Sequence, residues 1–325
     1  IKAVVWAGTW QAIFFVLAAL ALIIYLIMHI HGGITEAYHI ANQSGRLSMF
    51  NFRFELNNPT TFWAGTANGF FVGLTAFGTD QEMVQRLLTV ETRKISQRTI
   101  LSTIFTVLPV YWMYLLIGTL LFVYFQQNPA LPLPSEEKEI LPFFATHYLP
   151  SGLKGLVLGA IIMASIDSPL SSLTSSFVSD IYRPLIRKNA GEKHYLLISR
   201  LGVVGFGMLL AGIAFLCTPV QNILWFAFQI LSITGGPMLG VFLLGLLTKK
   251  KVNRINILTM LFSTAVTIPM LILIDKKQLN LGWSWLIVIG TVITFLGSYL
   301  SGLLLEKTGS SPPQNDNPAG SPGSP

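Results

Sequence analysis

The stretch of the chain richest in groups that could do chemistry is Gly155–Leu185, where serine hydroxyls gather on an apolar helix. At helical spacing one face carries Ile161, Ala164, Ser165, Ser168, Ser172, Ser175 or Ser176, and Ser179. Hydrocarbon offers hydroxyl groups no partner, so this face is expected to contact other helices or water. Pro169 has no N–H and cannot bond the carbonyl of Ser165, four residues earlier. Ser165 is therefore expected to offer a hydroxyl and a free carbonyl, which suit a hard cation such as sodium.

Close helix packing is the alternative use of such small residues, with each serine bonding back to its own helix. The same stretch contains Asp167, and ionisable residues inside membrane helices are usually paired or functional because burying them is costly. From this stretch alone, a cation site and a packing surface both stay open.

The composition predicts an all-α polytopic membrane protein embedded in the lipid bilayer of the cell membrane. Of the 325 residues, 52% are hydrophobic and 11% are charged, whereas soluble domains carry about 25% charged residues. The net charge of +7 lies in short loops, which indicates topology signals and no nucleic-acid partner. The single cysteine, Cys217, cannot build a disulfide framework or a thiolate cluster, and the five histidines lack zinc or haem spacing.

About eight transmembrane spans are predicted, each with the roughly 20 apolar residues that crossing a bilayer requires. They cover residues 3–30, 62–88, 100–124, 155–185, 196–216, 222–247, 255–274 and 283–305. A short amphipathic helix over 140–148 is expected to lie on the membrane surface. Residues 1–306 thus form a membrane domain, and the Ser-, Pro- and Gly-rich residues 307–325 are expected to be a disordered cytoplasmic tail.

The loop charges predict the orientation of these spans. Basic residues follow the second, fourth and sixth spans: Arg86, Arg93, Lys94, Arg98; Arg183, Arg187, Lys188, Lys193; Lys249, Lys250, Lys251 and Arg254. The other loops are poor in basic residues or acidic, so the positive-inside rule places both ends of the chain in the cytoplasm. Because the chain opens inside its first span without an initiator methionine, we expect it to be a fragment with an upstream part.

Two spans carry the marks of an interrupted helix. The second contains Gly65, Gly69, Gly73 and Gly78 and ends at Asp80, while the sixth contains Thr234–Pro237, the sequence TGGP. Unwound helices of this kind hold substrate or ion in the middle of transporters. The alternative is that the glycines serve close packing and the proline a simple kink.

Three segments resemble the sodium/solute symporter family, which includes sodium–glucose cotransporters and proline permease. They are GTDQEMVQRLL (78–88), MASIDSPLSSLTSSFVSDIY (163–182) and FQILSITGGPMLGVFLLGLL (228–247), and the likeness extends from the first residue to about Leu305. It implies the second half of an inverted-repeat, broken-helix transporter fold that starts at the fifth core helix. The missing N-terminal helices would belong to the same or another chain, and sodium would drive symport of a small organic solute.

The resemblance also implies site residues. The family's common sodium site falls on Ile161 (carbonyl), Ala164 and Ser165 (hydroxyls), and Ala164 departs from the usual Ser or Thr. A second sodium site in some members needs an Asp where this chain has Gly8. The solute would contact Phe77, at the position of an aromatic under the sugar ring, and Gln229. Ala76 replaces the neighbouring gating Tyr of the sugar transporters, so the resemblance does not imply a sugar.

Two other classes of function were weighed. A membrane enzyme would need convergent acid–base or metal groups, and His147 near the acidic residues Glu136, Glu137 and Glu139 lacks ligand spacing, so no enzyme is predicted. A degenerate, non-transporting sensor on the same fold is the remaining alternative, because Ala164 and Gly8 both lack a family ligand.

Overall fold

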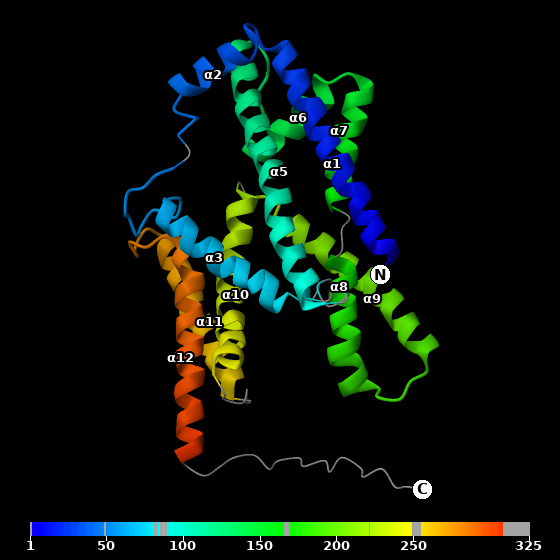
Figure 1. Ribbon diagram of the computed structural model, residues 1–325, viewed down its shortest axis with the longest axis vertical. Helices are drawn as coiled ribbons and strands as arrows, with labels where there is room; N and C mark the ends of the chain where they lie inside the picture. Colours follow the sequence, from blue (N-terminus) through cyan, green and yellow to red (C-terminus); the bar gives the residue numbers. More distant parts are fainter. Residues whose placement is uncertain are drawn as a thin grey trace. The chain divides into compact units, whose positions relative to one another are not determined.

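The computed structural model describes residues 2–48, 50–80, 83–84, 87, 90, 92–165, 169–220, 222–248 and 255–307, and these residues are mainly helical (Figure 1). The chain divides into two compact units. The first comprises Ile1–Asn51 and Asp80–Ala227, and the second Phe52–Thr79 and Phe228–Pro325. The tail residues 308–325, and Asp167 and Ser168, lie outside the described residues.

The first unit is built around a long apolar helix, α1, that packs between two others. Its elements are α1 (Lys2–His29), α2 (Gly33–Gln43), α5 (Arg93–Gln127), η1 (Glu137–Glu139), α6 (Ile140–His147), α7 (Ser151–Ser165), α8 (Pro169–Ser176), the π-helix η2 (Phe177–Ile186) and α9 (Glu192–Leu216). Helix α1 contacts both α5 and α7 (Figure 1). The predicted surface helix over 140–148 is present as α6.

Small and large apolar side chains form the core of this unit. Ala18 and Leu22 of α1, Leu121 of α5, Phe144 of α6 and Ala160 of α7 are all buried in one cluster. Between membrane helices such packing stabilises the arrangement mainly through van der Waals contact. The core therefore fixes α1 against the end of α7 that carries the predicted cation ligands.

The predicted single span over 155–185 is described in three parts, and residues 166–168 within it lie outside the described residues. Helix α7 extends to Ser165, α8 is described from Pro169 on, and η2 follows it. Helix α7 packs on α1, whereas α8 packs on α9, with the methyl group of Thr174 against Gly202. The described residues of the face predicted over 161–179 therefore belong partly to α7 and partly to α8 and η2.

The second unit contains α3 (Phe62–Thr79), most of α10 (Ile223–Leu247), α11 (Ile255–Asp275), η3 (Trp283–Trp285) and α12 (Leu286–Lys307). Helices α3 and α10 meet where the side chain of Thr75 lies against Gly235 and the ring of Phe242 against Gly78. Helices α11 and α12 pack side by side (Figure 1).

Helix α10 is continuous through Thr234–Pro237, where the sequence led us to expect an unwound segment. A Cβ atom at Gly236 would lie 2.8 Å from the carbonyl oxygen of Ile287, and one at Gly240 would lie 2.8 Å from that of Thr291. These two glycines therefore let the backbones of α10 and α12 approach each other, as small residues do in membrane helix pairs. The packing alternative weighed from the sequence is the correct one for this segment.

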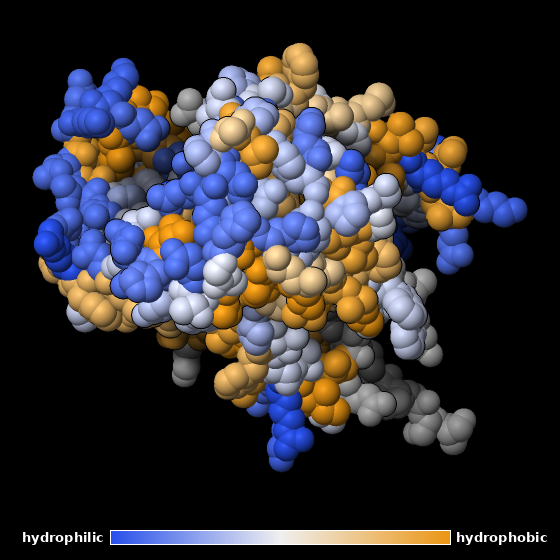
Figure 2. Space-filling model, turned by 90° about the horizontal axis from the view of Figure 1, so that it is seen from above, coloured by the Kyte–Doolittle hydropathy of each residue, from blue (hydrophilic) through white to orange (hydrophobic). Residues whose placement is uncertain are grey.

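In the described residues, six helices are long and apolar enough to cross a membrane: α1, α5, α9, α10, α11 and α12. They coincide with six of the eight predicted spans. The other two predicted spans correspond to α3 and to the divided segment from α7 to η2. Large apolar side chains such as Phe105, Met208 and Phe215 remain exposed, and Figure 2 shows hydrophobic surface beside hydrophilic surface. Exposed apolar surface of this extent is typical of helices that contact lipid or further helices.

Candidate functional site

Helix α7 contacts α1 through one of its backbone oxygens. The amide nitrogen of Gln11 on α1 donates to the carbonyl of Met163 over 3.4 Å, which is long for a hydrogen bond. A backbone oxygen of α7 thus meets a polar side chain close to the predicted sodium ligands.

The predicted sodium ligands Ile161, Ala164 and Ser165 all lie in the last two turns of α7. Ile161 is half-buried and packs on the apolar core of the first unit. The residue four positions after Ser165 is Pro169, which has no N–H to bond the Ser165 carbonyl. The structure thus groups these three backbone positions at one helix end.

Gln11 is a site residue that the sequence reasoning missed. It lies one helical turn after Gly8, the position where the resemblance implies an Asp in some family members. Gly8 has open space where a Cβ atom would be, since no heavy atom lies within 4 Å. An amide in the middle of an apolar span is itself a signal, because such a group needs a polar partner. Gln11 finds one at the end of α7.

The two predicted solute contacts, Phe77 and Gln229, both lie in the second unit and are both half-buried. Phe77 is on α3 and Gln229 is on the first half of α10. Within the described part of the chain, the Gln229 amide makes no hydrogen bond and Phe77 no ring contact. The structure places each on one of two packed helices without joining their side chains.

A buried polar cluster, formed by Asn68, Ser232 and Ser284, lies one turn from Gln229. The amide nitrogen of Asn68 on α3 donates to the carbonyl of Ser284 at 2.9 Å and to the hydroxyl of Ser232 at 3.4 Å. The hydroxyl of Ser284 and the indole nitrogen of Trp285 are buried without a partner among the described residues. Because unpaired buried polar groups are costly, this cluster has spare capacity to bind a polar molecule.

The chemistry available is that of neutral oxygen and amide groups. Among the described residues, no group of three His, Cys, Asp or Glu side chains lies close enough to hold a metal ion. Backbone carbonyls at the end of α7 and the amides of Gln11, Asn68 and Gln229 remain as the groups that could meet an ion or a polar solute. Such ligands suit weak, reversible binding of a hard monovalent cation.

Comparison with known proteins gives consistent matches. The profile described as "Sodium:solute symporter family" matches residues 1–261. The sodium/sialic acid symporter NanT of Aliivibrio fischeri is 28% identical over 310 residues, which cover 93% of this chain and 60% of NanT. The sodium/sialic acid symporter SiaT of Proteus mirabilis is 30% identical over 269 residues, or 77% of this chain and 52% of SiaT. The sodium-dependent multivitamin transporter of Oryctolagus cuniculus is 29% identical over 76% of this chain and 40% of its own length.

A solved structure of similar fold is that of a Na+-coupled sialic acid symporter in a substrate-bound, outward-open state. It matches with a TM-score of 0.78 and 25% sequence identity, covering 94% of this chain and 62% of the symporter. The chain therefore spans at most about three fifths of the length of these relatives.

Proposed function

The chain belongs to the sodium:solute symporter family, and we propose that it serves sodium-coupled symport of a small organic solute by alternating access. The observation that carries the proposal is the fold likeness to a Na+-coupled symporter across 94% of the chain. The sodium-coupled solute transporters among the sequence relatives support the same class of function. The chain is a multi-pass membrane protein, and we infer from its loop charges that both ends lie in the cytoplasm.

Sodium would bind at the end of α7. The ligands on this chain would be the carbonyl of Ile161 and the hydroxyl and carbonyl oxygens of Ser165, while Ala164 contributes no hydroxyl. Further ligands would come from helices that complete the fold, on the same or another chain. A site with few ligands at the end of a helix releases its ion easily, and transport requires that release.

The solute would contact Phe77 and Gln229, with the Asn68 cluster holding α3 against α10 beside them. Two groups of relatives are named as sodium/sialic acid symporters and sodium-coupled monocarboxylate transporters. Their names support an organic acid as the solute. An amide side chain such as Gln229 can donate to a carboxylate or hydroxyl oxygen.

Coupling requires that sodium and solute both prefer the same state of the transporter. Sodium at the end of α7 would bias the protein toward the outward-open state, and the occupied solute pocket would then favour closure. The coupling free energy cannot exceed the difference in affinity that each ligand shows between the two states.

The test is uptake by the complete gene product reconstituted in proteoliposomes. Radiolabelled organic acids and neutral sugars would be offered under an inward sodium gradient, with an equal potassium gradient as the control. We expect uptake of at least one acid that depends on sodium and is abolished by a sodium ionophore. Normal folding with no sodium-dependent uptake, or with uptake independent of sodium, would contradict the proposal.

A further inference from the structure

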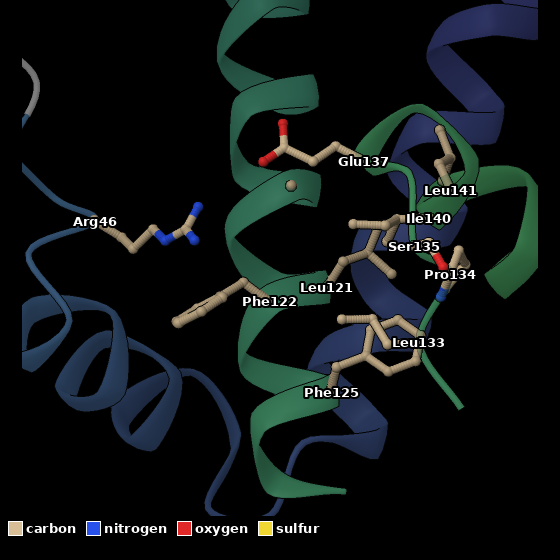
Figure 3. Close-up of a pocket in the computed structure, with 11 residues that line it drawn as sticks. Arg46, Leu121, Phe122, Phe125, Leu133, Pro134, Ser135, Glu137, Ile140 and Leu141 are labelled. Atoms are coloured by element: carbon tan, nitrogen blue, oxygen red, sulfur yellow. The ribbon is translucent and has the colours of Figure 1, made fainter. Parts of the chain in front are cut away.

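The first unit contains a cavity whose lining does not include the residues assigned to sodium and solute. It has a volume of about 530 Å³, within the usual range of ligand sites. Its lining comes from the last turns of α5, the loop before η1, the start of α6 and the turn after α2 (Figure 3). Leu121, Phe125, Leu133, Ile140 and Leu141 make most of this lining apolar.

Two opposite charges stand at the edge of the cavity. The guanidinium carbon of Arg46 lies 4.2 Å from the ring centre of Phe122, a cation–π contact that holds the positive charge in place. Glu137 supplies a carboxylate from η1. Within the described residues neither charge forms an ion pair. Both charges therefore remain available to a ligand.

The cavity lies at the end of a membrane helix. It is lined by Gly118–Phe125 of α5, which ends at Gln127. Aromatic residues gather at the same end, where Tyr124, Phe125, Phe143 and Tyr148 contact one another. Aromatic belts of this kind lie at the level of lipid headgroups.

We propose that this cavity binds a zwitterionic phospholipid with a primary ammonium in its headgroup, such as phosphatidylethanolamine. The phosphate would pair with Arg46, whose guanidinium stays charged at every working pH. The ammonium would donate to the carboxylate of Glu137, a charge-assisted hydrogen bond. The upper part of an acyl chain would cover Leu121, Phe125 and Leu133. The cavity thus matches a lipid in charge, polarity and depth, and the proposal does not rest on transport.

The experiment measures lipid binding to the delipidated full gene product in detergent by native mass spectrometry. Phosphatidylethanolamine and phosphatidylglycerol with identical acyl chains would be titrated separately. We expect phosphatidylethanolamine to bind at least tenfold more tightly, because phosphatidylglycerol has no ammonium and meets the charge of Glu137. Equal binding of the two lipids would overturn the proposal.

Variants assign the preference to this cavity. Glu137→Gln should reduce the preference for phosphatidylethanolamine at least fivefold, whereas Glu139→Gln, a neighbouring exposed acid outside the lining, should leave it unchanged. Arg46→Gln should weaken the binding of both lipids, and Arg46→Lys should retain it. An unchanged preference in the Glu137 variant would refute the site. Binding of soluble glycerophosphoethanolamine as tight as that of the lipid would also refute it, since the acyl chain would then contribute nothing.

Discussion

At the scale of single residues, the predicted sodium ligands on α7 include one position without a hydroxyl. Gln11 donates to the nearby carbonyl of Met163, and Pro169, which has no N–H, cannot bond the carbonyl of Ser165. Ala164 gives no hydroxyl where relatives of this family are expected to have one. Sodium affinity should therefore depend strongly on Ser165 and should be open to improvement at Ala164.

Substituting Ser165 with alanine tests the first part of this argument. Ser165→Ala should raise the sodium concentration for half-maximal uptake about tenfold or more, which corresponds to about 1.4 kcal/mol. Ala164→Ser should lower that concentration, because it adds a hydroxyl ligand. Ser151→Ala, at the opposite end of α7, is the matched control. A normally folded Ser165→Ala variant with the sodium dependence of the parent would remove Ser165 from the site.

Gln229 is the residue on which solute affinity should depend. Gln229→Ala should weaken solute binding by about 1–3 kcal/mol, because the polar solute atom that it bonds would be left unsatisfied in a closed pocket. Competition of unlabelled solute against radiolabelled uptake measures this change. The control is Gln278→Ala, in an exposed loop of the same unit. If parent and Gln229 variant bind solute equally, Gln229 is a packing residue.

At the scale of elements, the backbones of α10 and α12 approach each other closely at their glycine residues. Gly290 of α12 lies opposite Pro237, and a Cβ added there would be 3.2 Å from the Cδ atom of Pro237. The hydroxyl of Ser263 on α11 donates to the carbonyl of Gly290 at 2.9 Å, which links the third helix to the pair. The small residues therefore allow α10, α11 and α12 to pack closely together. Composition alone predicts only that each of these helices lies in a membrane.

Adding a methyl group at this contact should destabilise the protein. Gly236→Ala and Gly240→Ala should each lower the free energy of unfolding by about 1–3 kcal/mol, the usual cost of overpacking. Gly73→Ala, where a Cβ atom would meet nothing within 4 Å, should be neutral or stabilising because alanine favours the helix. Thermal unfolding in detergent measures the difference. Equal melting temperatures for Gly236→Ala and Gly73→Ala would show that the close contact does not exist.

The elements also show what could be predicted from the sequence. The sequence predicted six of the long apolar helices and the helix α6, because their lengths and patterns follow from local composition. Whether Gly235–Pro237 is unwound or helical could not be predicted, since this depends on whether α12 packs against the glycines. Gln11 and Asn68 were detectable as amides in apolar spans, but their partners, Met163 and Ser284, lie far away in the sequence.

At the scale of the whole molecule, loop charges and apolar helices set the position in the membrane. In helix α9 none of the most apolar stretch is buried, and in α5 very little of the corresponding stretch is buried. Lipid or further helices must therefore cover these two helices. The positive-inside rule then gives each loop a side. It predicts that the basic turn between η2 and α9 lies in the cytoplasm and that the far end of α9 lies outside.

Cys217, the single cysteine of these 325 residues, tests this orientation in a parent protein whose cysteines outside these residues, where there are any, are replaced by serine. Cys217 caps the C-terminus of α9 and is a free, partly exposed thiol. In intact cells a membrane-impermeant maleimide should therefore label the parent protein from outside. In the matched control, Cys217→Ser combined with Lys188→Cys, the cysteine lies in the basic turn and should react only after the cells are opened. Labelling of the control but not of the parent in intact cells would reverse the orientation and place both ends of the chain outside.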